Sequence, residues 1–175
     1  MRIAVYESLN LLHGRFGSRE FGKLCQKLLA ITFQRAGFGH VVERGVQGVD
    51  VDAAGPGGKF SAEVKTTRSG VVKFEPKDVD GLRARRLDGY HSLLAALRLG
   101  PLCDWVLADA DHLEAGSIAL DRLRPYRRRN LEDQLRPVFG EVVTEHAPGT
   151  LRGAQAYLDG VLARSGIAMC DGRMS

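Results

Sequence analysis

The sequence predicts a single α/β domain, with a mixed β-sheet flanked by helices and a helical C-terminal extension. Three observations predict this fold class. Apolar residues recur with a helical period over residues 18–36, the period changes to two over residues 41–67, and helix-like segments return after residue 115. With 175 residues and 44% hydrophobic composition, the chain can bury one core but is short for two domains.

The composition excludes several classes of protein. No apolar run approaches the roughly 20 residues that span a bilayer, the first residues lack a signal-peptide hydrophobic region, and three widely spaced cysteines form no CxxC pair. We therefore expect a cytoplasmic protein with no membrane partner. The net charge is +4, with clusters at residues 83–86 and 122–129. Arginine excess favours a phosphate-bearing partner, but a GC-rich genome or solvated helix faces would also produce it.

The first regular element is a helix over residues 18–36. Its apolar residues follow the i, i+3, i+4, i+7 spacing, Ser18 is a suitable N-cap, and Gly37 suits the position after the C-terminus. Residues 1–16 contain a short alternating run that leads through a polar bend to this helix.

Two strands joined by a glycine-rich turn follow a short strand at residues 41–44. Residues 49–53 alternate strictly between apolar and acidic, residues 54–59 have turn composition, and residues 60–67 alternate again. Such a pattern predicts a β-hairpin.

The later segments predict shorter elements. Residues 76–87 form a helix opened by proline, and residues 92–99 form a strand rather than a helix, because residues 104–108 resemble its hairpin partner. Short helices are expected at residues 118–123, 131–139 and 150–163, with a frayed segment after Gly166.

The hairpin carries four charged residues on one face. A two-residue Gly-Gly turn would place Asp52 opposite Glu63 and Asp50 opposite Lys65, and a slip of two residues would keep all four on that face. Neighbouring carboxylates are typical ligands of Mg²⁺, which can activate a water and stabilise charge on a phosphate. A solvated hairpin face with cross-strand ion pairs is the alternative. Glu20, at the edge of the apolar helix stripe, is expected to point toward this sheet.

The order of these segments resembles a known family. A helix begins with Gly17–Phe21 and leads into Val42–Arg44, and the hairpin then supplies Val49–Ala53 and Ala62–Thr67. This arrangement resembles the PD-(D/E)XK nuclease superfamily, with its restriction-endonuclease-like fold, and most closely the archaeal-type Holliday junction resolvases. The resemblance implies a nuclease core over residues 1–115, with residues 116–175 as a helical extension of the same domain.

The resemblance also implies roles for individual residues in a metal-dependent DNA endonuclease. Asp50, Glu63 and the backbone carbonyl of Val64 would hold Mg²⁺, with Mn²⁺ as a substitute. Lys65 would be the catalytic lysine, and Glu20 would orient water or metal.

The sequence departs from the family pattern at one position and offers a second aspartate. Val49 stands where the nominal motif has proline. Asp52 is a further candidate ligand, although Asp50 is preferred because alanine at the third position after it fits the resolvase pattern.

Basic residues near these elements fit a DNA partner. Arg15 and Arg19 flank Glu20, while Lys73 and Lys77 follow the Glu-x-Lys strand. By analogy with the resolvases, these four would contact phosphates, and a four-way junction with two-fold symmetry would favour a homodimer.

Three other functions remain open at this point. A nuclease of the same superfamily in restriction or repair would cut linear duplex. A non-catalytic DNA-binding protein on the same fold would bind without metal and form no product. A protein-interaction role would leave the arginine clusters without a phosphate partner.

Overall fold

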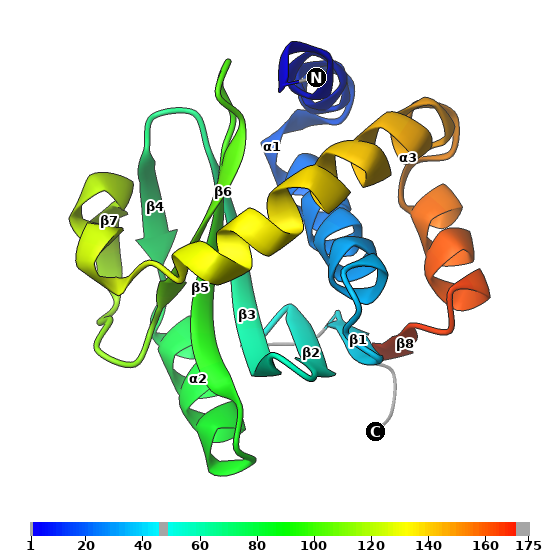
Figure 1. The fold of residues 1–175 in the computed structure, drawn as a ribbon. Coiled ribbons are helices and arrows are strands. Elements are labelled where there is room, and N and C mark those ends of the chain that lie inside the picture. Colours follow the sequence, from blue (N-terminus) through cyan, green and yellow to red (C-terminus); the bar gives the residue numbers. More distant parts are fainter. Residues whose placement is uncertain (1, 46–48, 171–175) are drawn as a thin grey trace.

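The computed structural model describes residues 2–45 and 49–170 and shows a six-stranded mixed sheet flanked by helices (Figure 1). The strand order is β6-β5-β3-β2-β1-β8, parallel between β3 and β5 and between β1 and β8, and antiparallel elsewhere. This confirms the predicted α/β class with a helical C-terminal region. The strand bounds are β1 His40–Arg44, β2 Val51–Gly55, β3 Gly58–Thr67, β5 His91–Arg98, β6 Asp104–Asp109 and β8 Ala168–Cys170.

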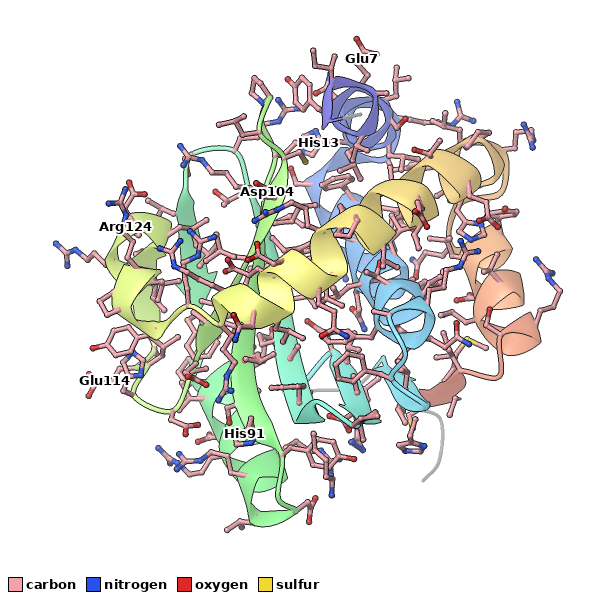
Figure 2. All side chains as sticks on the ribbon, viewed as in Figure 1. Glu7, His13, His91, Asp104, Glu114 and Arg124 are labelled. Atoms are coloured by element: carbon pink, nitrogen blue, oxygen red, sulfur yellow. The ribbon has the colours of Figure 1, made fainter. Side chains whose placement is uncertain are left out.

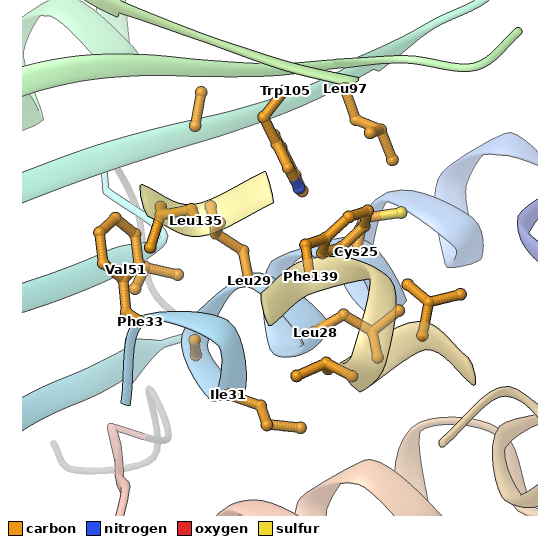
Figure 3. Close-up of a cluster of buried hydrophobic side chains, with 14 of the residues drawn as sticks. Cys25, Leu28, Leu29, Ile31, Phe33, Val51, Leu97, Trp105, Leu135 and Phe139 are labelled. Carbon is orange, nitrogen blue, oxygen red and sulfur yellow. The ribbon is translucent and has the colours of Figure 1, made fainter. Parts of the chain in front are cut away.

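Two long helices cover one face of the sheet. Helix α1, Arg2–Arg35, and helix α3, Arg129–Arg164, pack on each other, on the right of the sheet in Figure 1. Figure 3 shows their apolar side chains meeting those of the strands, for example Phe139 of α3 against Trp105 of β6, with 5.5 Å between the ring centroids. This cluster is the larger core, and it fixes α1 against the sheet.

The other face carries a smaller core. Helix α2, Pro76–Leu87, lies there with a two-stranded ribbon of β4, Val71–Phe74, and β7, Gly116–Ala119, followed by the 3-10 helix η1, Leu120–Tyr126. Their apolar residues pack against the even-numbered positions of β5 and β6, such as Leu94 and Val106. The sheet is therefore buried on both faces.

The β2–β3 hairpin forms with its register shifted by two residues from the prediction. Val51 pairs with Ala62 and Gly55 with Gly58, so Pro56 and Gly57 make the turn instead of the predicted Gly-Gly pair. Asp52 consequently faces Ser61 rather than Glu63. A shift of two preserves the side of the sheet on which each residue lies, so the predicted charged face survives the change.

The prediction for the N-terminal segment was wrong. Residues 2–16 are helical, and α1 contains a single break at Gly17, whose φ is 75° and ψ is 169°. Val5, Leu9 and Leu12 recur at helical spacing and are buried in the larger core. Packing of this stripe against the rest of the core stabilises a helix that the two nearby glycines argued against.

Three C-terminal predictions also need correction. Residues 118–119 belong to β7, and a 3-10 helix rather than an α-helix follows. Two helical segments form within α3, as predicted, but their boundary was wrong: the first continues across Pro137 and Pro148, and the break between them is at Ala154, where φ is 50°. Residues 168–170 are not frayed, because they pair with β1 as β8. The end of that segment, 171–175, lies outside the described residues.

Other predictions were correct. Helix α2 has the predicted bounds, β5 and β6 form an antiparallel pair, and Gly37 follows α1 with a φ of 98°. The three cysteines are free, and Cys25 lies in the core. Within the described part of the chain, none of the helices is long and apolar enough to cross a membrane.

Candidate active site

Asp50 lies just before the start of β2, where the hairpin ends and β3 continues. Its backbone N–H donates to the carbonyl of Ala62 at 3.0 Å, and its Oδ2 accepts the backbone N–H of Val64 at 2.8 Å. The carboxylate thus accepts the N–H of Val64 in place of the backbone carbonyl that a longer β2 would supply. This contact aims Asp50 at the same face of β3 that carries Glu63.

Lys65 lies between two carboxylates from different elements. Its Nζ is 2.8 Å from Oε1 of Glu63, two residues earlier on β3, and 2.7 Å from Oδ2 of Asp78 on α2. Asp78 is buried at the first turn of α2, where the same Oδ2 accepts the N–H of Glu75 at 2.8 Å as part of a capping box. The cap therefore holds Asp78 in place beside Lys65.

The electrostatics of this cluster favour a further cation. Burial, together with the charges of Asp78 and Glu43, raises the pKa of Asp50 to about 6, against the opposing effects of the Val64 N–H and Lys65. Burial and the charge of Asp50 raise the pKa of Glu63 to about 8, although Lys65 partly offsets this. One lysine is thus insufficient to neutralise the carboxylates at this end of the hairpin.

Burial acts in the opposite direction on Lys65. It lowers the pKa of the ammonium, but Glu63 and Asp78 outweigh it, so the net pKa lies above its ordinary value. Lys65 is therefore a fixed positive charge at neutral pH and is suited to stabilising anionic groups rather than to accepting a proton.

A polar cavity of about 750 Å³ opens beside these residues. Its walls come from α1, the end of β1, the start of β2, β3, the first turn of α2, and the last part of α3. The acidic lining residues are Glu43, Asp50, Glu63, Asp78 and Asp159, and the basic ones are Lys23, Lys27, Arg44 and Lys77. A lining that combines carboxylates and cations suits a phosphate-bearing substrate together with a metal ion.

Gln26 of α1 is hydrogen-bonded to the end of β1 and to Asp50, two segments that line the cavity. Its Nε2 donates to Oε1 of Glu43 at 2.7 Å, to the Arg44 carbonyl at 3.0 Å and to the Asp50 carbonyl at 3.3 Å. Lys27, also on α1, lies 3.3 Å from Glu43 and 2.7 Å from Asp159. These contacts fix the backbone on which Asp50 is carried.

Asp52 shares the face of the sheet with Asp50 but has a different environment. Its oxygens accept from Ser61 Oγ at 2.5 Å, Arg44 Nη1 at 2.8 Å and Arg85 Nη2 at 2.7 Å. Two arginines neutralise this carboxylate, so Asp52 has a structural role as the acidic partner of Arg44 and Arg85.

Glu20 lies on α1, on the same helical face as Lys23 and Lys27. It is half-buried, and its Oε1 accepts from Nε2 of Gln155 at 2.6 Å, a residue that lines the cavity. Among the described residues, Glu20 has no hydrogen bond or ion pair to the Asp50–Glu63–Lys65 group. It lies at the margin of the cavity rather than at its centre.

The four basic residues predicted to contact DNA do not form one cluster. Lys77, the first residue after Pro76, lines the cavity, and its Nζ is 3.1 Å from Glu75. Lys73 is on β4, 3.8 Å from the same glutamate. Arg15 and Arg19 are exposed on either side of the break in α1.

Sequence reasoning missed several residues of the cavity. Lys23 and Lys27 follow Glu20 at i+3 and i+7, so the helical period that selected Glu20 could also have found them. Asp78 carried a signal too, as an acidic residue in the first turn of a predicted helix. Gln26 carried none, because its role depends on strand ends far along the chain.

Comparisons with known proteins place few constraints on this chain. No protein-family model matches it, and no curated protein matches its sequence. Among solved structures, it is similar to a Holliday junction resolvase, Hjc, from the archaeal hyperthermophile Archaeoglobus fulgidus. The TM-score is 0.49 with 17% identity, over 60% of this chain and 89% of that chain. The function must therefore be argued from the site itself.

The residues of the site fit Mg²⁺ bound together with substrate. Within residues 2–45 and 49–170, no group of three or more His, Cys, Asp or Glu side chains is arranged to hold a metal ion. Mg²⁺ is usually held by one or two carboxylates, with waters and substrate phosphate completing its coordination, rather than by an all-protein cage. Asp50 and Glu63, whose pKa values are raised first by burial and then by neighbouring carboxylates, match this donor set.

Proposed function

We propose that the chain is a Mg²⁺-dependent endodeoxyribonuclease that hydrolyses phosphodiester bonds. One observation carries the proposal: two buried carboxylates with raised pKa values, Asp50 just before β2 and Glu63 on β3, line a cavity that basic residues also line, and Lys65 lies 2.8 Å from Glu63. Carboxylate pairs of this kind hold the metal of phosphate-hydrolysing sites.

The metal-holding role belongs to Asp50, Glu63 and the carbonyl of Val64. Asp50 is preferred to Asp52, because Arg44 and Arg85 already neutralise Asp52. When bound, Mg²⁺ would lower the pKa of a water molecule and stabilise the negative charge of the phosphate. In the reaction, a water oxygen forms a bond to phosphorus and a P–O ester bond breaks, leaving a phosphomonoester and a hydroxyl.

Lys65 stabilises the negative charge that develops on the phosphate oxygens. Its high pKa keeps it protonated, and the ion pairs with Glu63 and Asp78 hold its ammonium at a fixed place. A preorganised charge of this kind is worth more in a partly buried site than in water. Asp78 is a positioning residue, and Glu20 would complete the site from its margin.

Basic residues around the cavity bind the DNA backbone. Lys23 and Lys77 are exposed and line the cavity, while Arg15, Arg19 and Lys73 are exposed outside it and would contact more distant phosphates. Such contacts give affinity but carry no sequence preference.

The resolvase-like order of sequence motifs supports a four-way junction as the DNA substrate and a homodimer as the acting species, in the cytoplasm. A two-fold symmetric dimer would present two equal cleavage centres to the junction. Nuclease activity in restriction or repair, on linear duplex, uses the same site and is the nearest alternative. A non-catalytic DNA-binding protein is the alternative of another class.

The decisive experiment is a cleavage assay with a labelled four-way junction, linear duplex and single strand, in Mg²⁺ or EDTA. Paired symmetric nicks near the branch point, lost in EDTA and in Lys65→Ala, are expected. Lys59→Ala is the matched control, because Lys59 lies on the same strand but is exposed near the turn. Cutting of linear duplex alone would refute the junction substrate, and binding without any product would refute the enzyme.

A further inference from the structure

A second cavity of about 360 Å³ lies where the β3–β4 loop meets the break in α1. Its lining is rich in hydroxyl and cationic groups, and two apolar side chains close it. The lining residues are His13, Ser18, Phe21, Thr66, Thr67, Arg68, Ser69 and Leu99. None of them has a role in the site described above.

His13 and Arg68 are hydrogen-bonded to each other in this cavity, with the guanidinium as donor and the imidazole as acceptor. The imidazole Nδ1 is 3.4 Å from Nη2 of Arg68, and Nε2 is 3.2 Å from Oγ of Ser18. The same Nη2 donates to Oδ1 of Asn10 at 2.6 Å. Figure 2 labels His13 on the first segment of α1, near the end of the sheet.

Arg68 differs from the arginines that stabilise the fold. Arg85 and Arg127, for example, form ion pairs with buried carboxylates at 2.7 and 2.6 Å. Among the described residues, no carboxylate lies within ion-pair distance of Arg68. Burial and the charge of Arg68 lower the pKa of His13. The guanidinium of Arg68 would gain from an anion that its remaining N–H groups can contact.

The loop that carries Arg68 is held in place by its own hydroxyl groups. Thr67 Oγ1 donates to the Val71 carbonyl at 2.8 Å and accepts the N–H of Gly70 at 3.1 Å. Oγ of Ser69 accepts the N–H of Val71 at 3.3 Å. Arg68 is therefore presented from a defined backbone, so that little ordering is needed when an anion binds.

Two elements connect this cavity to the candidate active site. Arg68 follows Lys65 by three residues of extended chain, which corresponds to about 10 Å. Ser18 precedes Lys23 by five residues of helix, or about 7.5 Å. One DNA strand advances about 3.4 Å along the axis for each phosphate. The cavity thus lies within roughly three nucleotides of the proposed cleavage centre.

We propose that His13, Ser18 and Arg68 form a subsite for a phosphodiester of the DNA backbone, close to the bond that is cut. This inference rests on the proposed nuclease function, which it extends by defining the path of the substrate strand: from Lys65, along the end of β3, to the break in α1. Arg68 supplies the charge and Ser18 supplies a hydroxyl donor, while His13 positions both, because its Nδ1 accepts from Arg68 and its Nε2 contacts Ser18 Oγ.

The test measures DNA binding in EDTA, so that it does not depend on cleavage. Arg68→Gln is expected to weaken binding of a duplex or junction about tenfold. The negative slope of log K against log salt should become shallower by about 0.9, because one phosphate contact is lost. His13→Gln is expected to weaken binding by a smaller factor. Arg124→Gln is the control, because Arg124 is an exposed arginine on η1 that lines neither of the two cavities.

Two further measurements decide the proposal. Where the protein cleaves DNA, KM should rise more than kcat falls in Arg68→Gln. Equal binding by Arg68→Gln and Arg124→Gln would overturn the subsite while cleavage by the wild type still supported the nuclease. Absence of cleavage with an intact Arg68 effect would refute the nuclease alone.

The source of the phosphate is tested with covalently closed DNA and with linear DNA with or without a 5′-phosphate. An equal effect of Arg68→Gln on closed and linear DNA supports an internal phosphodiester. An effect confined to ends bearing a phosphate would overturn the proposed strand path.

Discussion

Asp50 and Asp52 are two residues apart on one face of one sheet, yet their surroundings differ in charge balance. Asp52 contacts two arginines and a serine, and its charge is neutralised within the fold. Asp50 contacts one backbone N–H and faces Glu63, with Lys65 shared between Glu63 and Asp78. The difference shows that the balance of charge, rather than the presence of acidic residues, separates a candidate catalytic group from a structural one.

The largest expected effect comes from removing the charge of Asp50. Asp50→Asn should reduce DNA cleavage by about a thousandfold or more, because it removes a proposed metal ligand of the reacting phosphate. Its thermal unfolding midpoint should stay close to that of the wild type, since the neutral amide replaces a carboxylate that burial already disfavours. Cleavage rates and thermal unfolding measured on the same samples check both expectations.

Asp52→Asn should show the opposite pattern. Loss of the buried charge between Arg44 and Arg85 should lower the free energy of unfolding by about 2 kcal/mol, as expected for hydrogen bonds to charged groups. Urea denaturation gives this value. Cleavage at a temperature where the variant is folded should fall far less than in Asp50→Asn; an equal loss would show that Asp52 belongs to the metal site.

Asp78→Asn sharpens the role of the third carboxylate. The amide can still accept the N–H of Glu75, so the helix cap persists, but the charge that positions Lys65 is lost. We expect kcat to fall about tenfold with little change in KM, as for a group that acts in the transition state. Asp78→Ala should add a loss of stability of about 1 kcal/mol from the missing cap. If both variants lose only stability, Asp78 has a purely structural role.

The smallest expected effect is stabilisation by Mg²⁺. At a Mg²⁺ concentration ten times its dissociation constant, binding to the folded state should add about 1.4 kcal/mol of stability. Differential scanning calorimetry in EDTA and Mg²⁺ should show this shift in wild type and in Lys59→Ala, but not in Asp50→Asn. A similar shift in Asp50→Asn would place the ion elsewhere.

The charged face of the hairpin could be predicted because side-chain alternation is local. Asp50, Glu63 and Lys65 stay on one face under any two-residue slip, so an error in the turn left the prediction intact. The turn itself was misassigned because Pro56, Gly57 and Gly58 all favour turns, and pairing along the whole hairpin selects among them.

The ends of the chain show where local signals are insufficient. Two glycines suggested a bend before residue 18, but only Gly17 breaks the helix, because Leu9 and Leu12 are buried against the core. Prolines at 137 and 148 did not separate two helices, since α3 packs along α1. Strand β8 has three exposed residues with little pattern of their own, and pairing with β1 defines it.

By itself the sequence determined the α/β class, the central hairpin and the acidic–basic set at its end, since these depend on periodicity and turn chemistry within short segments. Only the tertiary structure decided which carboxylates are neutralised, because Arg85, Asp78 and Gln26 reach their hairpin partners from helices that lie 13 to 33 residues away in the sequence. Burial and the pKa of a side chain depend on all the groups that surround it, and those groups are assembled only when the chain has folded.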